Sequence, residues 1–135
     1  MNEINLEADG KTLKLTYEVW DIIVWCEVCF VQDGVSTILG GDTIERILSK
    51  LVIGFMEVED RYFANYRGLE MYTVIVLQPL SQIAGHIDDC GDLELLYIDT
   101  PGNVTPLMKL TTEDKLNWIT QIFKHMKDFM LEHGS

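Results

Sequence analysis

The sequence predicts an α+β domain in which two amphipathic helices pack on one mainly antiparallel sheet of five to six strands. Two observations support this fold class. Alternating or β-branched segments occur in groups of three, and each group is followed by a segment with helical periodicity. Runs of strands separated by single helices are typical of α+β domains. The length predicts a single domain, residues 1–135, and no internal repeat is evident.

The first half begins with three predicted strands. Apolar and polar residues alternate over residues 13–20, which is the period of a half-buried strand. The next strand, 22–31, is more continuously apolar and has two apolar faces. Asp33-Gly34 then predicts a tight hairpin turn before a short return strand, 35–39.

A first helix is predicted to begin at Asp42, which is a favourable capping residue with Glu45 three positions later. The helix should end near residues 54–58. Its expected buried face is a stripe at helical spacing: Ile44, Ile47, Leu48, Leu51, Val52 and Phe55.

The second half repeats this order less clearly. Residues 71–77, 93–98 and 104–110 are predicted strands, and the last two form a hairpin. Residues 80–91 show no clear period. Thr111 or Thr112 caps a last helix, because acidic residues follow where the helix dipole favours them. Its expected buried face is Leu116, Ile119, Ile122, Phe123, Met126, Phe129 and Met130.

Charge is the strongest functional indication. The chain has 22 acidic and 10 basic residues, for a net charge of -12. Such a surface repels nucleic acid and anionic membranes and attracts basic proteins, so no nucleic-acid or membrane partner is expected. A cytoplasmic location is expected, since no signal peptide or membrane-spanning run is present and three cysteines fit a reducing compartment.

No catalytic motif accompanies this charge. The serines lie outside a nucleophile elbow, and the glycines form no phosphate-binding pattern. The chain is therefore expected not to be an enzyme and to need no cofactor. Cys26 and Cys29 form a C-x-x-C within a predicted strand, where such positions point to opposite faces. These thiols are expected to fill the core rather than to bind a metal.

Two acidic clusters are the predicted partner-binding sites. Self-repulsion makes such clusters costly in the free protein, and a cationic partner relieves that cost. The first cluster precedes and enters the strand 93–98: Asp88, Asp89, Asp92 and Glu94. The second lies at the expected end of the first helix, where the dipole disfavours negative charge: Glu57, Glu59 and Asp60. Solvated surface charge is the alternative for both, and a metal site is a lesser alternative for the first.

Glu27 is the polar residue in the apolar strand 22–31, and its surroundings have two interpretations. If its face is open, Glu27 and Trp25 lie together on an exposed surface. If its face is covered, the carboxylate needs a cationic partner such as Arg46, Lys50 or Lys109.

This profile resembles the immunity proteins of bacterial polymorphic-toxin and contact-dependent growth-inhibition systems. Those are acidic, cytoplasmic, one-domain α+β chains without catalytic residues, and the strand 93–98 and the helix that follows Leu110-Thr111-Thr112-Glu113-Asp114-Lys115 are similar to that class. The resemblance implies binding and neutralisation of a basic toxin, often a nuclease, and it assigns no particular residues. The alternatives are a secretion or assembly chaperone with an exposed apolar groove, and a small-ligand-binding domain.

Overall fold

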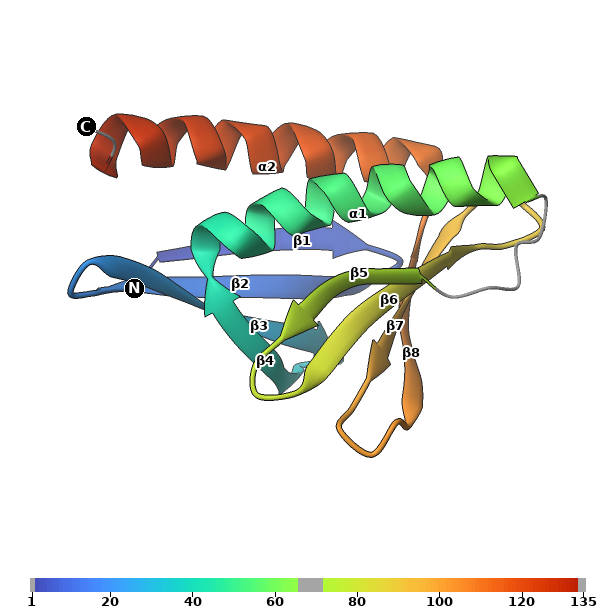
Figure 1. The fold of residues 1–135 in the computed structure, drawn as a ribbon, viewed down its shortest axis with the longest axis horizontal. Helices are drawn as coiled ribbons and strands as arrows, with labels where there is room; N and C mark the ends of the chain where they lie inside the picture. The colour runs from blue at the N-terminus through green and yellow to red at the C-terminus, as the bar shows by residue number, and fades with distance from the viewer. Residues whose placement is uncertain (1, 66–71, 134–135) are drawn as a thin grey trace.

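The computed structural model describes residues 2–65 and 72–133, without the side chains of residues 59–65 and 129–133. It contains two four-stranded antiparallel sheets and two helices (Figure 1). The first sheet is formed by β1 (Asn2–Ala8), β2 (Lys11–Trp20), β3 (Ile23–Gln32) and β4 (Val35–Thr43), and α1 (Ile44–Asn65) follows it. The second is formed by β5 (Tyr72–Leu77), β6 (Ser81–Ile87), β7 (Leu93–Ile98) and β8 (Val104–Leu110), and α2 (Thr112–His133) follows it.

The prediction of one sheet with five to six strands is therefore wrong, although the α+β class and the two helices are correct. In each sheet the strands pair in chain order. The long helix α1 separates the two meanders in the chain. Among the described residues, the backbones of the two sheets pair through an isolated bridge between Gly41 in β4 and Gln78, the residue after β5. Each half of the chain thus has the same order of four strands and a helix, whereas the sequence predicted three strands and a helix in each half.

Two strands were not predicted from the sequence. β1 pairs with β2 across Asp9-Gly10, whose positive φ angles of 57° and 71° match those of the predicted turn at Asp33-Gly34, 53° and 77°. β6 lies between β5 and β7, and it carries the small buried residues Ala84 and Gly85. Because both faces of β6 are largely buried, the polar alternation that marks a half-exposed strand is missing.

Both helices lie on the same side of the two sheets, and α1 and α2 run beside each other (Figure 1). α1 packs on β5 and β6 and also contacts β3 and β4, whereas α2 packs on β1 and β8. Side chains from both sheets and both helices form one hydrophobic core, for example Leu15, Leu51, Ile83, Leu95 and Ile122.

The predicted buried face of α1 is confirmed. Five of its six residues are buried and Val52 is partly buried. The helix continues to Asn65 instead of ending near residues 54–58, and Val58 extends the buried stripe. Gly54 does not end the helix. It allows α1 to approach β5, because a Cβ atom at this position would lie 2.7 Å from a methyl carbon of Val74.

The cap of α2 is formed by Thr111. The backbone N–H of Asp114 donates to the Thr111 hydroxyl oxygen at 3.1 Å, and the Thr111 N–H donates to the Asp114 carboxylate at 3.0 Å. This reciprocal pair is a capping box, which fixes the start of the helix.

The buried face of α2 differs from the predicted one. Trp118 and Ile122 are fully buried, and the Trp118 indole N–H donates to the backbone oxygen of Glu7 at 2.9 Å. Leu116 and Phe123 are 61% and 55% exposed, so their assignment to the core is wrong. The contact with β1 selects the face that carries Trp118. The predicted core residues Phe129 and Met130 lie outside the described side chains.

Candidate protein-binding surface

The end of the β2–β3 hairpin protrudes from the first sheet. β1 pairs with β2 only as far as Tyr17, and β4 pairs with β3 only from Trp25 onward. Among the described residues, 18–24 therefore pair only across the β2–β3 hairpin, and we call this segment the hairpin tip. It is the loop that extends furthest to the left in Figure 1.

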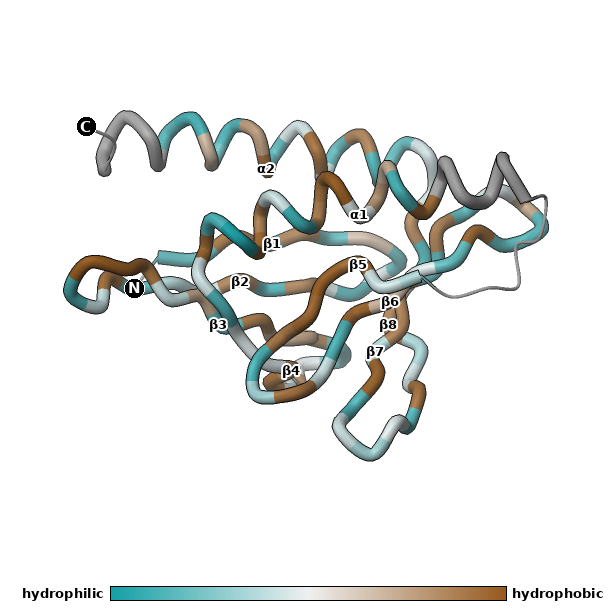
Figure 2. Tube along the Cα trace, in the orientation of Figure 1, coloured by the Kyte–Doolittle hydropathy of each residue, from teal (hydrophilic) through white to brown (hydrophobic). Residues whose placement is uncertain are grey.

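Large apolar side chains cover the hairpin tip. Val19 is 57% exposed, Trp20 46%, Ile22 92% and Ile23 42%. Figure 2 shows hydrophobic residues along much of this loop. Single exposed apolar residues are normal in proteins, but a contiguous group on a protruding element is typical of an interaction site.

A pair of stacked tryptophans supports the hairpin tip. The rings of Trp20 and Trp25 lie 5.4 Å apart between centroids, with 7° between their planes. The Trp20 indole N–H donates to the Glu18 carboxylate, which fixes the ring further. Together with Tyr17 and Glu27 these side chains line a shallow depression of about 160 Å³. These contacts favour the observed orientation of the aromatic surface in the free protein.

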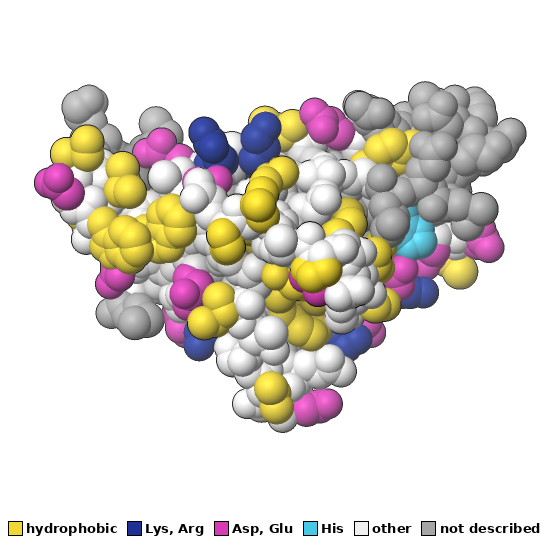
Figure 3. Space-filling model, turned by 60° about the horizontal axis from the view of Figure 1, so that its bottom comes forward, with side chains coloured by type: hydrophobic (Ala, Val, Ile, Leu, Met, Phe, Trp, Pro, Cys, Tyr) yellow, Lys and Arg dark blue, Asp and Glu magenta, His cyan; other side chains and the backbone are white. Residues whose placement is uncertain are grey.

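All charged residues in the sequence around these apolar groups are acidic. Residues 15–45 contain no lysine, arginine or histidine, and their acidic residues are Glu18, Asp21, Glu27, Asp33, Asp42 and Glu45. The six negative charges are half of the net charge of -12. Figure 3 shows hydrophobic side chains gathered at the end that carries the hairpin tip, with acidic side chains at their margin.

Glu27 fits the open-face interpretation better than the covered one. Its side chain is partly buried and lies beside Trp25 in the depression under the hairpin tip. Within the described part of the chain no lysine or arginine forms an ion pair with it, and the thiol of Cys29 lies 3.8 Å from its carboxylate.

Asp88, in the first predicted cluster, is bonded within the chain. Its carboxylate accepts the backbone N–H groups of Cys90 at 2.9 Å and Asp92 at 3.0 Å, and it lies 3.3 Å from the Lys109 ammonium. Burial raises the pKa of Asp88, but the two hydrogen bonds and Lys109 lower it more, so that it lies below its usual value. Asp88 therefore shapes the β6–β7 turn.

The other members of that cluster differ in their surroundings. Glu94 faces His86 on the neighbouring strand, with 2.6 Å between carboxylate oxygen and ring nitrogen. Asp92 is partly buried, and Asp89 is exposed. The structure thus brings the four carboxylates to one region, but two of them already have partners in the chain. The role of the cluster in partner binding stays a prediction.

The second cluster was predicted at the C-terminal end of the first helix, but the helix does not end at those residues. α1 continues to Asn65, so Glu57 lies within the helix and not at its C-terminus. Its side chain is exposed and lines a cleft beside β5. The side chains of Glu59 and Asp60 lie outside the described residues.

Cys26 and Cys29 are both buried, as expected for core residues. Burial, with smaller contributions from Cys29 and Glu27, raises the pKa of the Cys26 thiol to about 12, and burial also raises the pKa of Cys29. Both therefore stay protonated thiols at neutral pH. Among the described residues, no three His, Cys, Asp or Glu side chains come close enough together to hold a metal ion.

Two comparisons with known proteins assign no family to this chain. No protein-family model matches the sequence, and a search of curated proteins finds no match. Within the described ranges, neither helix is long and apolar enough to cross a membrane.

Sequence reasoning missed the hairpin tip because alternation indicates which residues share a face, but not where the neighbouring strands stop. The signal that was available is the long stretch without basic residues, with Val19-Trp20-Asp21-Ile22-Ile23 inside it. Asp21 adopts a positive φ of 57° and marks the turn.

Proposed function

We propose that this chain is a non-catalytic binding protein that neutralises a basic protein partner by direct contact, as the immunity proteins of polymorphic-toxin systems do. The observation that carries the proposal is the hairpin tip, where Trp20, Ile22 and Ile23 are exposed within a stretch of sequence whose charged residues are all acidic. A surface of this composition suits a partner with an apolar pocket inside a basic groove.

The two components of the surface have separate roles. A few buried aromatic and aliphatic anchors supply most of the affinity of a protein interface. The surrounding charges accelerate association and exclude partners of the wrong charge. Since the groove of a nuclease is basic to hold phosphates, an acidic hairpin inserted there occupies the substrate site. We therefore infer a nuclease domain as the class of toxin, in the cytoplasm of the producing cell.

Co-purification from the native cell, followed by identification of the retained protein, tests this proposal. We expect a basic protein to be retained by the unchanged chain and lost by the double variant Trp20→Ala, Ile22→Ala. The matched control is Leu116→Ala with Phe123→Ala, which removes two other exposed apolar side chains, both on α2. Equal retention by both variants, or retention of acidic proteins only, contradicts the proposal.

A further inference from the structure

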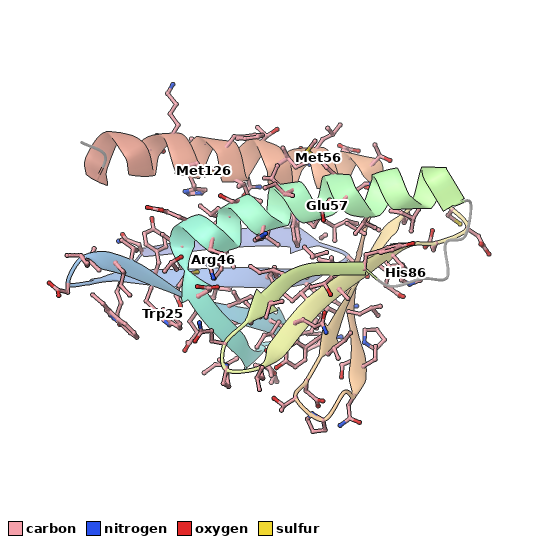
Figure 4. The ribbon with its side chains drawn as sticks, viewed as in Figure 1. Trp25, Arg46, Met56, Glu57, His86 and Met126 are labelled. Atoms are coloured by element: carbon pink, nitrogen blue, oxygen red, sulfur yellow. The ribbon has the colours of Figure 1, made fainter. Side chains whose placement is uncertain are left out.

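The depression under the hairpin tip lies on the face of the first sheet that is turned away from the helices. Cys26 and Val28 on β3 belong to the core, so Trp25 and Glu27, which alternate with them, point to the opposite face. Figure 4 shows Trp25 on that side of the sheet. The lining combines aromatic residues with two carboxylates and, among the described residues, contains no basic one: Thr16, Tyr17, Glu18, Trp20, Trp25 and Glu27.

The two carboxylates of this lining lie on neighbouring strands. Glu18 is opposite Trp25, and Glu27 is opposite Thr16, so Glu18 and Glu27 are diagonal neighbours on one face of the sheet. The backbones of such neighbours lie about 7–8 Å apart, and a long side chain that enters between them can reach both. A single cation with several hydrogen-bond donors can therefore contact both carboxylates.

No cationic side chain of the described part of the chain neutralises these two carboxylates. Its ion pairs include neither Glu18 nor Glu27. Glu18 accepts the indole N–H of Trp20, which is a neutral donor. Lys14, on the same face of β2, lies 3.5 Å from the Glu3 carboxylate. The depression therefore offers two negative charges and further acceptor positions to a bound cation.

The size and the aromatic wall of the depression favour a guanidinium group. Its volume of about 160 Å³ is below the ~300–1,000 Å³ typical of sites for whole small molecules, so it has room for one side chain. The parallel rings of Trp20 and Trp25 offer a flat surface. A guanidinium is planar, stacks on aromatic rings and forks to carboxylates, whereas the ammonium of lysine is compact and more strongly hydrated.

We propose that the depression binds an arginine side chain of the basic partner, with the guanidinium against the tryptophan rings and between Glu18 and Glu27. The proposal deepens the function proposed above, and the identity of the occupant as a residue of that partner rests on it. The exposed side chains of the hairpin tip supply the apolar anchors, and the depression adds a charged contact that fixes the orientation of the partner beside them.

Capped tripeptides with a central arginine, lysine or citrulline test the site on the purified chain alone. Citrulline has nearly the shape of arginine but carries no charge. We expect the arginine peptide to shift the indole N–H signals of Trp20 and Trp25 in heteronuclear NMR spectra. It should bind about tenfold more tightly than the citrulline peptide, the difference expected for one charge-assisted hydrogen bond, and also more tightly than the lysine peptide.

Two variants and one internal control locate the binding. Glu27→Gln keeps the shape of the side chain and removes its charge, so the arginine peptide should bind this variant about tenfold more weakly. Glu7→Gln makes the same change at an exposed position of β1 and should bind normally. Asp33 is exposed in the β3–β4 turn, and its amide signal should move little, because general attraction to the acidic surface is weak.

Four outcomes overturn the arginine site. They are equal binding of the arginine and citrulline peptides, equal binding of the arginine and lysine peptides, unchanged binding to Glu27→Gln, and a shift at Asp33 as large as those of the tryptophans.

Peptide binding and co-purification distinguish this proposal from the proposed function. If a basic protein is retained but the arginine peptide does not bind, the arginine site is wrong and the proposed function stands. If the peptide binds but no basic protein is retained, the proposed function is wrong and the depression remains selective for arginine.

Discussion

The Asp88 carboxylate connects two parts of the second sheet, because it bonds to the backbone of the β6–β7 turn and to Lys109 on β8. Its pKa lies below the ordinary value of 3.8 in the folded chain. Between the lower, folded pKa and the ordinary value, the unfolded chain therefore binds more protons at this residue than the folded chain does. The resulting stability is present above pH 3.8 and is lost as pH falls through the lower, folded pKa.

Asp88→Asn tests this contribution, because it keeps an acceptor oxygen and removes the charge. We expect the variant to be less stable than the parent at pH 7 in urea unfolding, and the difference to shrink as pH is lowered below 3.8. Asp89→Asn changes the same charge at an exposed neighbour and is the control. A difference independent of pH would show that the charge of Asp88 does not stabilise the turn.

The contacts of individual side chains were only partly predictable from the sequence. The sequence located the acidic clusters because composition is read directly from it. It did not show that Asp88 and Glu94 have internal partners, because Lys109 lies 21 positions from Asp88 in the chain and joins it only through strand pairing. The prediction that Cys26 and Cys29 are both buried was correct, because the continuous apolar character of their strand is a local property of the sequence.

At the scale of elements, the contact between α1 and β5 depends on a glycine. In an exposed helix Gly→Ala adds about 1 kcal/mol of stability. In Gly54→Ala the new methyl group would lie 2.7 Å from Val74, and overpacking costs about 1–3 kcal/mol. We expect a net destabilisation in urea unfolding. Val74→Ala in the same chain should recover part of the loss, whereas a more stable Gly54→Ala would contradict this packing.

The orientation of α2 gives a second test among the elements. Trp118→Ala should reduce the free energy of unfolding by about 3–5 kcal/mol, because it empties a fully buried site. Phe123→Ala should change it by less than about 0.5 kcal/mol, because that ring is 55% exposed. Thermal unfolding of the two variants side by side measures the difference. Similar losses would mean that α2 packs through the face predicted from sequence.

These helices show why prediction succeeded for one element and failed for another. α1 has a single apolar stripe, and periodicity located it. α2 has apolar residues on more than one face, including Leu116, Trp118 and Phe123, so its neighbours decide which face is buried. The number of sheets could not be predicted either, because pairing across α1 is a long-range property. β1 could have been found from Asp9-Gly10, which is as strong a turn signal as Asp33-Gly34.

At the scale of the whole molecule, the net charge of -12 governs how a partner approaches. Charges are screened over about 10 Å at 0.1 M salt, so the association rate with the basic partner should fall steeply between low and high salt. Trp20→Ala should instead raise the dissociation rate and leave the salt dependence unchanged. Stopped-flow measurements at several salt concentrations separate the two effects. A rate independent of salt would exclude electrostatic steering.

The positions of β1, α2 and the β6–β7 turn relative to the hairpin tip matter for any assay in which this protein is immobilised on a surface. The start of β1 and the end of α2 lie toward the end of the molecule from which the β2–β3 hairpin protrudes (Figure 1). An affinity tag at either terminus would anchor the chain with its hairpin tip facing the sensor surface and hinder partner access. The β6–β7 turn lies toward the opposite end (Figure 1), and it contains the exposed thiol of Cys90. Coupling through this thiol would orient the hairpin tip toward the solution.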